Sequence, residues 1–191
     1  MSVVAGPPGS GKTTALPGHS FRVDAFNIDD RCAALTGSYV GITPALRARV
    51  GRECEAFIAA HIAAKRSFTV ETTLRTLRAV EQAREARRVG FETVMYFLCT
   101  SSPEIAFERV RARSTGGGHG AREEIVRTAY AASLANLQHA IETFDVVRCF
   151  DTSRHGAPPV QAAVARNGVL TVLDTATPEW VAALGIPRGR S

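Results

Sequence analysis

A glycine-rich segment of eight residues near the start of the chain restricts its fold more than any other feature. Residues 6–13, with the sequence GPPGSGKT, match the pattern G-x-x-x-x-G-K-[S/T]. The apolar residues 3–5 predict a strand before this segment, and residues 13–16 can begin a helix after it. In such a unit the glycines let successive backbone amides face inward and cradle a phosphate group at the start of the helix. The alternative is a glycine-rich turn capped by Thr13, and the strand, the helix and the lysine together argue against it.

The residues of this loop predict a site for ATP or GTP. Lys12 is expected to bridge the β- and γ-phosphates, and the Thr13 hydroxyl is expected to bind Mg²⁺. The 23 basic residues include two lysines, Lys12 and Lys65, so the other 21 are arginine. A lysine at this position is therefore informative, because a compact ammonium suits the phosphates. The predicted nucleotide-binding residues are Gly6, Pro7, Pro8, Gly9, Ser10, Gly11, Lys12, Thr13 and Thr14.

Length, hydrophobic content and the order of predicted elements indicate one α/β domain over residues 1–191. We predict a P-loop NTPase fold of the kinase type, a three-layer sandwich with a mainly parallel central sheet. Expected strands cover 21–28, 67–71, 92–99 and 145–150, and expected helices cover 44–65, 77–89, 103–113, 122–141 and 179–184. A C-terminal hairpin over 159–173, turning at Asn167-Gly168, lies in a C-terminal region of about 158–185.

Charge and cysteine content indicate the setting of the protein. No stretch approaches 18 apolar residues and no signal pattern begins the chain, so we expect a cytoplasmic protein with no membrane association. A net charge of +5 suits anionic ligands. The four cysteines lack metal-binding spacing, so we expect them to be reduced and mostly buried, with no disulfide and no zinc. They are Cys32, Cys54, Cys99 and Cys149.

Three carboxylates follow predicted strands, where ligands of α/β proteins bind. Asp29 and Asp30 follow the strand over 21–28, and Glu71 closes the strand over 67–71. A kinase needs a carboxylate that accepts the proton of the attacking hydroxyl, and Asp29 is the candidate base. The alternative is that Asp29 or Asp30 caps the helix beginning at Arg31. Glu71 is interpreted as a functional residue rather than a surface carboxylate.

Arginines surround a glycine run at 116–118 and predict a lid over about 109–122. Phosphoryl transfer needs positive charge that closes over the γ-phosphate and excludes water, and a hinged loop with arginines supplies it. Arg109 and Arg113 share one helix face, whereas Arg111 points elsewhere. Arg122 follows the glycines. The alternative for these arginines is a solvated helix face.

Taken together, these motifs resemble the zeta-toxin family of P-loop small-molecule kinases over residues 2–153. The segments that carry the resemblance are the phosphate loop, Phe26-Asn27-Ile28-Asp29, Phe68-Thr69-Val70-Glu71-Thr72-Thr73-Leu74, Arg109-Val110 with Arg113, Gly117-Gly118-His119, and Ser133-Leu134-Ala135-Asn136-Leu137. The resemblance implies transfer of phosphate from ATP or GTP to a hydroxyl, with UDP-N-acetylglucosamine as the acceptor of the best-known members. It also implies Asp29 as the base, Arg109 and Arg113 as catalytic lid residues, and contacts with the acceptor from Asp29, Glu71, Thr72, Thr73, His119 and Arg122. A small helical antitoxin is the partner that the family implies.

The sequence departs from this family before Ser133, where two or three expected arginines are missing. Arg122 and Arg127 are candidates to replace that charge. Two other functions remain open. A polynucleotide 5′-hydroxyl kinase is suggested by Asp29-Asp30-Arg31, although aromatic residues that could stack on bases make up only 7% of the chain. A non-catalytic nucleotide-binding module is the other, although it would need no proton acceptor.

Overall fold

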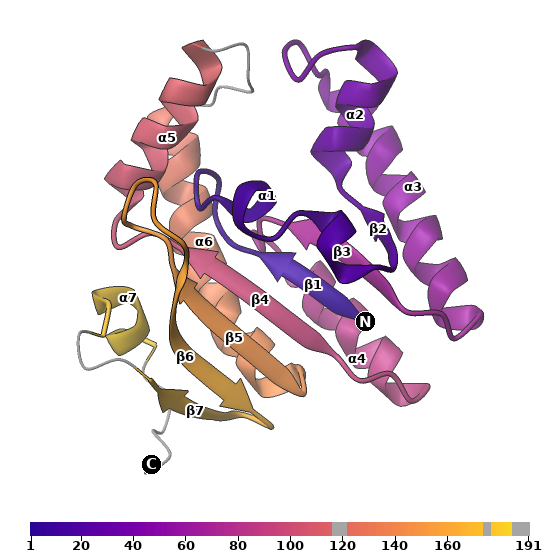
Figure 1. Cartoon of the computed structure of the whole chain (residues 1–191). Helices are drawn as coiled ribbons and strands as arrows, with labels where there is room; N and C mark the ends of the chain where they lie inside the picture. The colour runs from indigo at the N-terminus through magenta and orange to yellow at the C-terminus, as the bar shows by residue number, and fades with distance from the viewer. Residues whose placement is uncertain (116–121, 174–176, 185–191) are drawn as a thin grey trace.

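The computed structural model describes residues 1–115, 122–173 and 177–184, and these form a seven-stranded sheet flanked by helices (Figure 1). The strand order is β2-β3-β1-β4-β5-β6-β7. The first five strands in this order are parallel, and β6 and β7 are antiparallel to their neighbours. The predicted α/β fold with a mainly parallel sheet is therefore confirmed. The strands are β1 (Ser2–Ala5), β2 (Asp24–Phe26), β3 (Phe68–Thr72), β4 (Val94–Cys99), β5 (Val146–Asp151), β6 (Val160–Arg166) and β7 (Val169–Val172).

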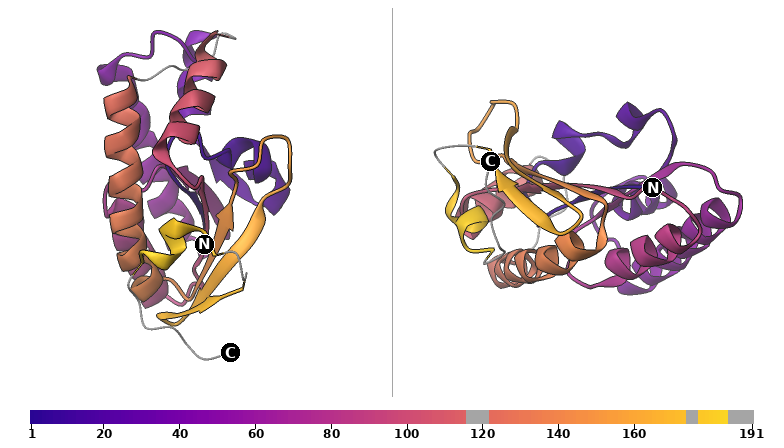
Figure 2. Two further views of the ribbon diagram at one scale, coloured as in Figure 1. Left: turned by 90° about the vertical axis from the view of Figure 1, so that its left-hand side faces the viewer. Right: turned by 90° about the horizontal axis from the view of Figure 1, so that it is seen from below.

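Helices cover the two faces of the sheet unequally. Three long helices, α3 (Pro44–Ala63), α4 (Arg78–Arg88) and α6 (Glu123–Thr143), cover one face. The single-turn α1 (Lys12–Ala15) and the 3₁₀ turn η1 (Gly18–Phe21) lie on the other (Figure 2). Beyond the carboxyl ends of the parallel strands, α2 (Ile28–Thr36) and α5 (Pro103–Thr115) stand on opposite sides of α1 (Figure 1). The expected three layers are present, but the layer that begins with α1 is short.

Successive side chains of a strand point to opposite faces of the sheet, and this alternation explains which face forms the core. Val3 and Ala5 of β1 and Phe68 and Val70 of β3 pack into the main hydrophobic cluster under the long helices. Val4 and Thr69 lie at alternate positions of these strands, so they face the side of α1. The four cysteines are free and buried, as expected, because they pack as small apolar side chains.

The segment that leads to Asp29 differs from its prediction. The strand expected over 21–28 is limited to Asp24–Phe26, and Asp29 and Asp30 lie in the first turn of α2. The side chain of Asn27 accepts hydrogen bonds from the amides of both aspartates, at 2.8 and 3.3 Å. Asn27 therefore caps the helix, and the interpretation of Asp29 or Asp30 as the cap is wrong. The side chains of Asp29 and Asp30 do not cap the helix, so they can make other contacts.

The C-terminal hairpin forms as predicted. Asn167 and Gly168, with φ of 48° and 82°, join β6 to β7 in the left-handed conformation that a tight hairpin turn requires. After it comes α7 (Glu179–Ala182), where Trp180 packs on Phe97 and donates to Asp151 across 3.3 Å. None of the described helices is long and apolar enough to cross a membrane.

Candidate functional site

The phosphate loop connects β1 to α1 and packs tightly against two other elements. A Cβ atom on Gly6 would lie 2.0 Å from the carbonyl oxygen of Leu98, at the end of β4. A Cβ atom on Gly9 would lie 2.1 Å from the carbonyl oxygen of Ala106, in α5. Both glycines have positive φ, at 142° and 79°. Glycine is therefore required at each position by conformation and by space, and the loop contacts the helix that leads to the lid directly.

The segment after β5 lies beside the same loop. Thr152 donates from Oγ1 toward the carbonyl oxygens of Ser10 and Cys99, at 3.0 and 3.1 Å. Arg109 of α5 donates from Nη2 to the carbonyl oxygens of Thr152 and Ser153, at 2.6 and 3.1 Å. The structure thus places this predicted lid arginine on backbone carbonyls, where it binds α5 to the strand end.

Lys12 is buried at the centre of the loop, with 8% of its side chain exposed. Its Nζ donates to the carbonyl oxygens of Gly6 and Pro7, at 2.9 and 3.1 Å. Burial lowers the pKa of Lys12, because charging the ammonium there sacrifices hydration. The negative charges of Glu71 and Asp29 oppose this shift in pKa, and the positive charge of Arg113 adds to it. The charges of both carboxylates and of the distal arginine of α5 therefore change the pKa of Lys12.

Glu71 of β3 lies against the first residues of α1. Thr13 Oγ1 is 3.1 Å from Glu71 Oε2, in hydrogen-bonding contact, and Lys12 Nζ lies 4.0 Å from Glu71 Oε1. Burial raises the pKa of Glu71, an effect opposed by Lys12 and by the hydrogen bond from Thr13. Sequence reasoning assigned Thr13 to the metal and Glu71 to the acceptor, and the structure brings the two side chains together.

The oxygen atoms of Thr13 and Glu71 are of the kind that Mg²⁺ prefers. Within residues 1–115, 122–173 and 177–184, no group of three or more His, Cys, Asp or Glu side chains is arranged to hold a metal ion.

The two aspartates of α2 have different partners. Arg47 of α3 forms an ion pair with Asp29, with 2.6 Å between Nη1 and Oδ1. Asp30 instead accepts a hydrogen bond from the Tyr39 hydroxyl at 2.9 Å. Sequence reasoning missed Arg47, because it used only the apolar stripe of this helix. The ion pair fixes the orientation of Asp29 on the side of the site opposite α5.

Two residues of α6 hold the chain after β3. Ser133 Oγ donates to the carbonyl oxygen of Thr73, and Asn136 Nδ2 donates to that of Leu74 at 2.9 Å. The amide of Leu74, with φ of 53°, donates to Thr72 Oγ1 at 3.1 Å. The Ser-Leu-x-Asn-Leu segment thus has a structural role, because it fixes the turn formed by Thr73 and Leu74 directly after β3 ends at Thr72.

The structure describes part of the segment predicted to be a lid. Arg113 is exposed near the end of α5, and Arg122 is exposed at the start of α6. His119 and the glycines at 116–118 lie outside the described residues. Arg127, a candidate for replacing missing charge, donates to Glu123 at 2.9 Å and to Glu104 at 2.5 Å, linking α6 to α5. Its charge is directed to these carboxylates.

Comparisons with known proteins agree with this architecture. A family model described as an AAA domain matches residues 1–140. The chain of AvrRxo1-ORF1:AvrRxo1-ORF2 solved with sulphate ions superposes with a TM-score of 0.71 at 16% identity, covering 99% of this chain and 65% of that one. The same complex with ATP gives 0.70 at 15% identity, covering 100% and 65%. A structure from the PezAT chromosomal toxin–antitoxin system of Streptococcus pneumoniae gives 0.56 at 16% identity, covering 80% and 68%. No curated protein matches the sequence.

At these identities the superpositions establish the fold. The chain spans about two thirds of the length of each of these solved chains.

Proposed function

Because this chain belongs to the AAA-domain family, whose model matches residues 1–140, we propose that it is a kinase that transfers the γ-phosphoryl group of ATP or GTP to a hydroxyl of a small molecule. The observation that carries the proposal is the contact of Glu71 with Lys12 and Thr13 beyond the carboxyl ends of the strands, with the charge of Asp29 acting on both Lys12 and Glu71. A binding module needs Lys12 and Thr13, but it has no use for a carboxylate fixed opposite the lysine. The related fold of a complex solved with ATP supports a nucleotide as the donor.

On the donor side, the loop amides and Lys12 bind the phosphates. Lys12 Nζ exchanges its carbonyl partners in the loop for phosphate oxygens, which are stronger acceptors because they are charged. Thr13 and Glu71 would hold Mg²⁺, and the ion would supply positive charge that neutralises the phosphates. Arg113 supplies further positive charge as the phosphoryl group transfers, since its field already reaches Lys12.

On the acceptor side, Asp29 is the general base. Its carboxylate takes the proton of the acceptor hydroxyl while that oxygen forms a bond to the γ-phosphorus, and the bond from phosphorus to the leaving nucleoside diphosphate breaks. Arg47 orients the carboxylate through their 2.6 Å ion pair. Glu71, Thr72 and Thr73 extend along the exit of β3, where they can contact the acceptor, together with His119 and Arg122 of the lid.

The acceptor that we propose to test first is a nucleotide sugar such as UDP-N-acetylglucosamine. It follows from the resemblance of the sequence motifs to those of zeta toxins. A panel of UDP-sugars, NAD and 5′-hydroxyl oligonucleotides is incubated with labelled ATP and GTP. Transfer to the oligonucleotide alone would identify a polynucleotide kinase, and nucleotide binding without any transfer would identify a binding module.

The catalytic assignment is tested with a matched pair of variants. Asp29→Asn is expected to lower kcat by about 10²- to 10⁴-fold and to leave nucleotide affinity unchanged, because it removes the proton acceptor without removing a phosphate contact. Asp30→Asn, one residue along the same helix turn, removes a neighbouring carboxylate but not the proposed base, so kcat should fall by less than about ten-fold. Equal losses in the two variants would contradict the assignment of the base.

A partner is proposed as well. The PezAT structure comes from a toxin–antitoxin system, and we expect a small helical inhibitor for this chain if it acts in the same way. Growth arrest on expression of the chain, relieved by co-expression of a neighbouring small gene and absent in the Asp29→Asn variant, would support this. Unimpaired growth with an active kinase would contradict it.

A further inference from the structure

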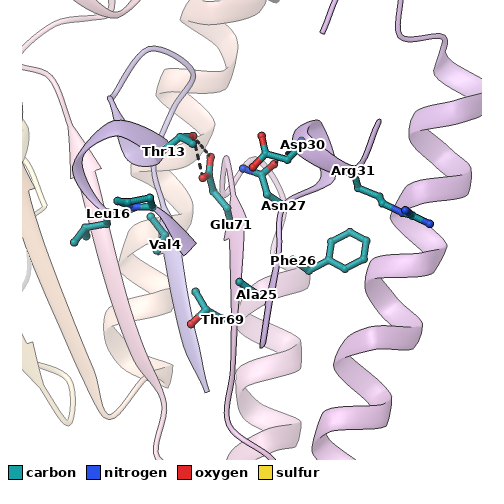
Figure 3. Close-up of a pocket in the computed structure, with 11 residues that line it drawn as sticks. Val4, Thr13, Leu16, Ala25, Phe26, Asn27, Asp30, Arg31, Thr69 and Glu71 are labelled. Atoms are coloured by element: carbon teal, nitrogen blue, oxygen red, sulfur yellow. Dashed lines mark hydrogen bonds between the residues drawn. The ribbon is translucent and has the colours of Figure 1, made fainter. Parts of the chain in front are cut away.

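A pocket of about 530 Å³ lies on the face of the sheet that carries α1 (Figure 3). Its floor is formed by side chains of three adjacent strands, Val4 of β1, Thr69 and Glu71 of β3, and Ala25 of β2. Strand register explains why they meet, because Val4 pairs with Glu71 and Ala25 pairs with Thr69. The volume is within the range of small-molecule sites.

The pocket exists because α1 ends after one turn. Pro17 cannot continue the helix, and the preceding Leu16 leaves the helical conformation, with φ of −137° and ψ of 70°. The chain then moves to η1, where Phe21 packs edge-on against Tyr96 of β4 with ring centres 5.2 Å apart. A longer α1 would continue over the sheet beyond Leu16, whereas here Leu16 and Pro17 form one wall of the pocket.

One polar group in the floor points to a ligand. The Thr69 side chain is buried, with 2% exposure, and within the described part of the chain its hydroxyl has no hydrogen-bond partner. The neighbouring Val4 and Ala25 side chains offer only carbon. A buried hydroxyl without a partner is unfavourable, because it has lost its hydrogen bonds to water and gained none. A ligand with a polar atom at this depth would satisfy it.

The charges around the pocket restrict what it can hold. Glu71 and Asp30 contribute carboxylates to its lining. The cation that lines it, Arg31, already donates from Nε to Glu53 at 2.9 Å. Glu71 is shared with the proposed Mg²⁺ site, but Asp30 remains a carboxylate in the lining, so an anionic group beside it would meet like charge without a dedicated cation. An uncharged group avoids this repulsion.

We propose that this pocket is the acceptor subsite, and that it binds an uncharged, mainly apolar ring whose polar atom hydrogen-bonds to Thr69. The inference rests on the proposed kinase function and specifies its substrate class. Thr13 and Glu71 also line the pocket, so a ring seated in it can place an attached hydroxyl next to the transfer site. In a nucleotide sugar the uncharged ring of this kind is the nucleobase, and the charged diphosphate lies outside the pocket.

Two variants test the subsite in the kinase reaction. Thr69→Val keeps the shape and removes the hydroxyl, so the KM for the acceptor should rise about ten-fold while the KM for the nucleotide stays unchanged. Ala25→Leu fills the floor and should abolish transfer while nucleotide affinity remains. Thr171→Val, on β7 at the opposite edge of the sheet, is the control for the loss of a threonine hydroxyl and should leave both KM values unchanged. Unchanged acceptor KM in both pocket variants would overturn the proposal.

A binding measurement tests the pocket independently of catalysis. Benzyl alcohol and benzoate are titrated separately into the full chain and followed by NMR. We expect the neutral ring to bind, benzoate to bind at least ten-fold more weakly, and Ala25→Leu to abolish the neutral ring's binding. Equal binding of the two would refute the charge argument, and binding of neither would refute the pocket. If wild-type protein phosphorylates no acceptor, the kinase proposal fails while this measurement still decides the subsite.

Discussion

Replacing Gly9 by alanine should destabilise the fold more than the same change at Gly11, although both glycines have nearly the same φ angle. Their φ angles are 79° and 77°. At Gly9 the new Cβ would lie 2.1 Å from the carbonyl oxygen of Ala106, whereas at Gly11 no atom lies within 4 Å among the described residues. The pair therefore separates the cost of backbone strain from the cost of forcing α5 away from the loop.

The expected magnitudes follow from these two terms. A left-handed conformation costs an alanine roughly 1–2 kcal/mol, which is the whole expected effect of Gly11→Ala. Gly9→Ala adds an overpacking cost of roughly 1–3 kcal/mol, because a backbone carbonyl in a helix cannot rotate away as a side chain does. The free energy of unfolding should thus fall by about 2–5 kcal/mol for Gly9→Ala.

Urea unfolding of the two variants without nucleotide, followed by circular dichroism, measures this difference. A change in the midpoint with an unchanged slope would show that stability and not compactness has changed. Equal losses in the two variants would refute the reasoning, since the contact between the loop and α5 would then contribute nothing. A loss larger in Gly11→Ala would refute it as well.

Two further predictions concern charged side chains. Arg113→Ala should lower kcat by about 10²- to 10³-fold with little change in nucleotide affinity, which steady-state kinetics would measure. Arg109→Ala should instead lower the free energy of unfolding by about 1–3 kcal/mol, because its hydrogen bonds to backbone carbonyls are lost, and urea titration would measure this. A kinetic effect of Arg109→Ala without any loss of stability would contradict the structural role of Arg109. The hydrogen bond from His61 lowers the pKa of Asp24 in the folded protein below the ordinary value of 3.8. Ionised Asp24 therefore stabilises the fold above pH 3.8, and this stabilisation is lost as the pH falls through the lowered pKa of the folded protein. In Asp24→Asn, the midpoint of urea unfolding should therefore fall less steeply as the pH is lowered through the acidic range. The same pH dependence in the variant and the wild-type protein would contradict this linkage.

Local signals in the sequence were sufficient for much of the fold. The hairpin at Asn167-Gly168 was predictable because a two-residue turn needs positive φ at both positions, and asparagine and glycine tolerate it best. The four expected helices from 44 to 141 formed to within a few residues. The segment before Asp29 was not predictable in the same way, because its apolar residues fit a strand of any length up to the helix cap at Asn27.

The candidate site was predictable in its members and less so in its contacts. The phosphate loop motif identifies Lys12 and Thr13, since their spacing is set by one continuous backbone turn. The sequence also selected Glu71 and Asp29, but it could not predict that Glu71 contacts Thr13 or that Arg47 pairs with Asp29. These contacts join residues 18 to 58 positions apart, and nothing local encodes them.

By itself, the sequence determined that the chain has a phosphate loop after its first strand, an α/β order of elements and a carboxylate near the end of the strand after the loop. These properties depend on residue type and short-range spacing, which backbone conformation converts directly into structure. The tertiary structure decided the rest: that Arg109 donates to backbone carbonyls whereas the charge of Arg113 acts on Lys12, and that the Thr69 hydroxyl is buried without a partner within the described residues. Such outcomes depend on which strands become neighbours, and parallel pairing brings together segments that the sequence keeps far apart.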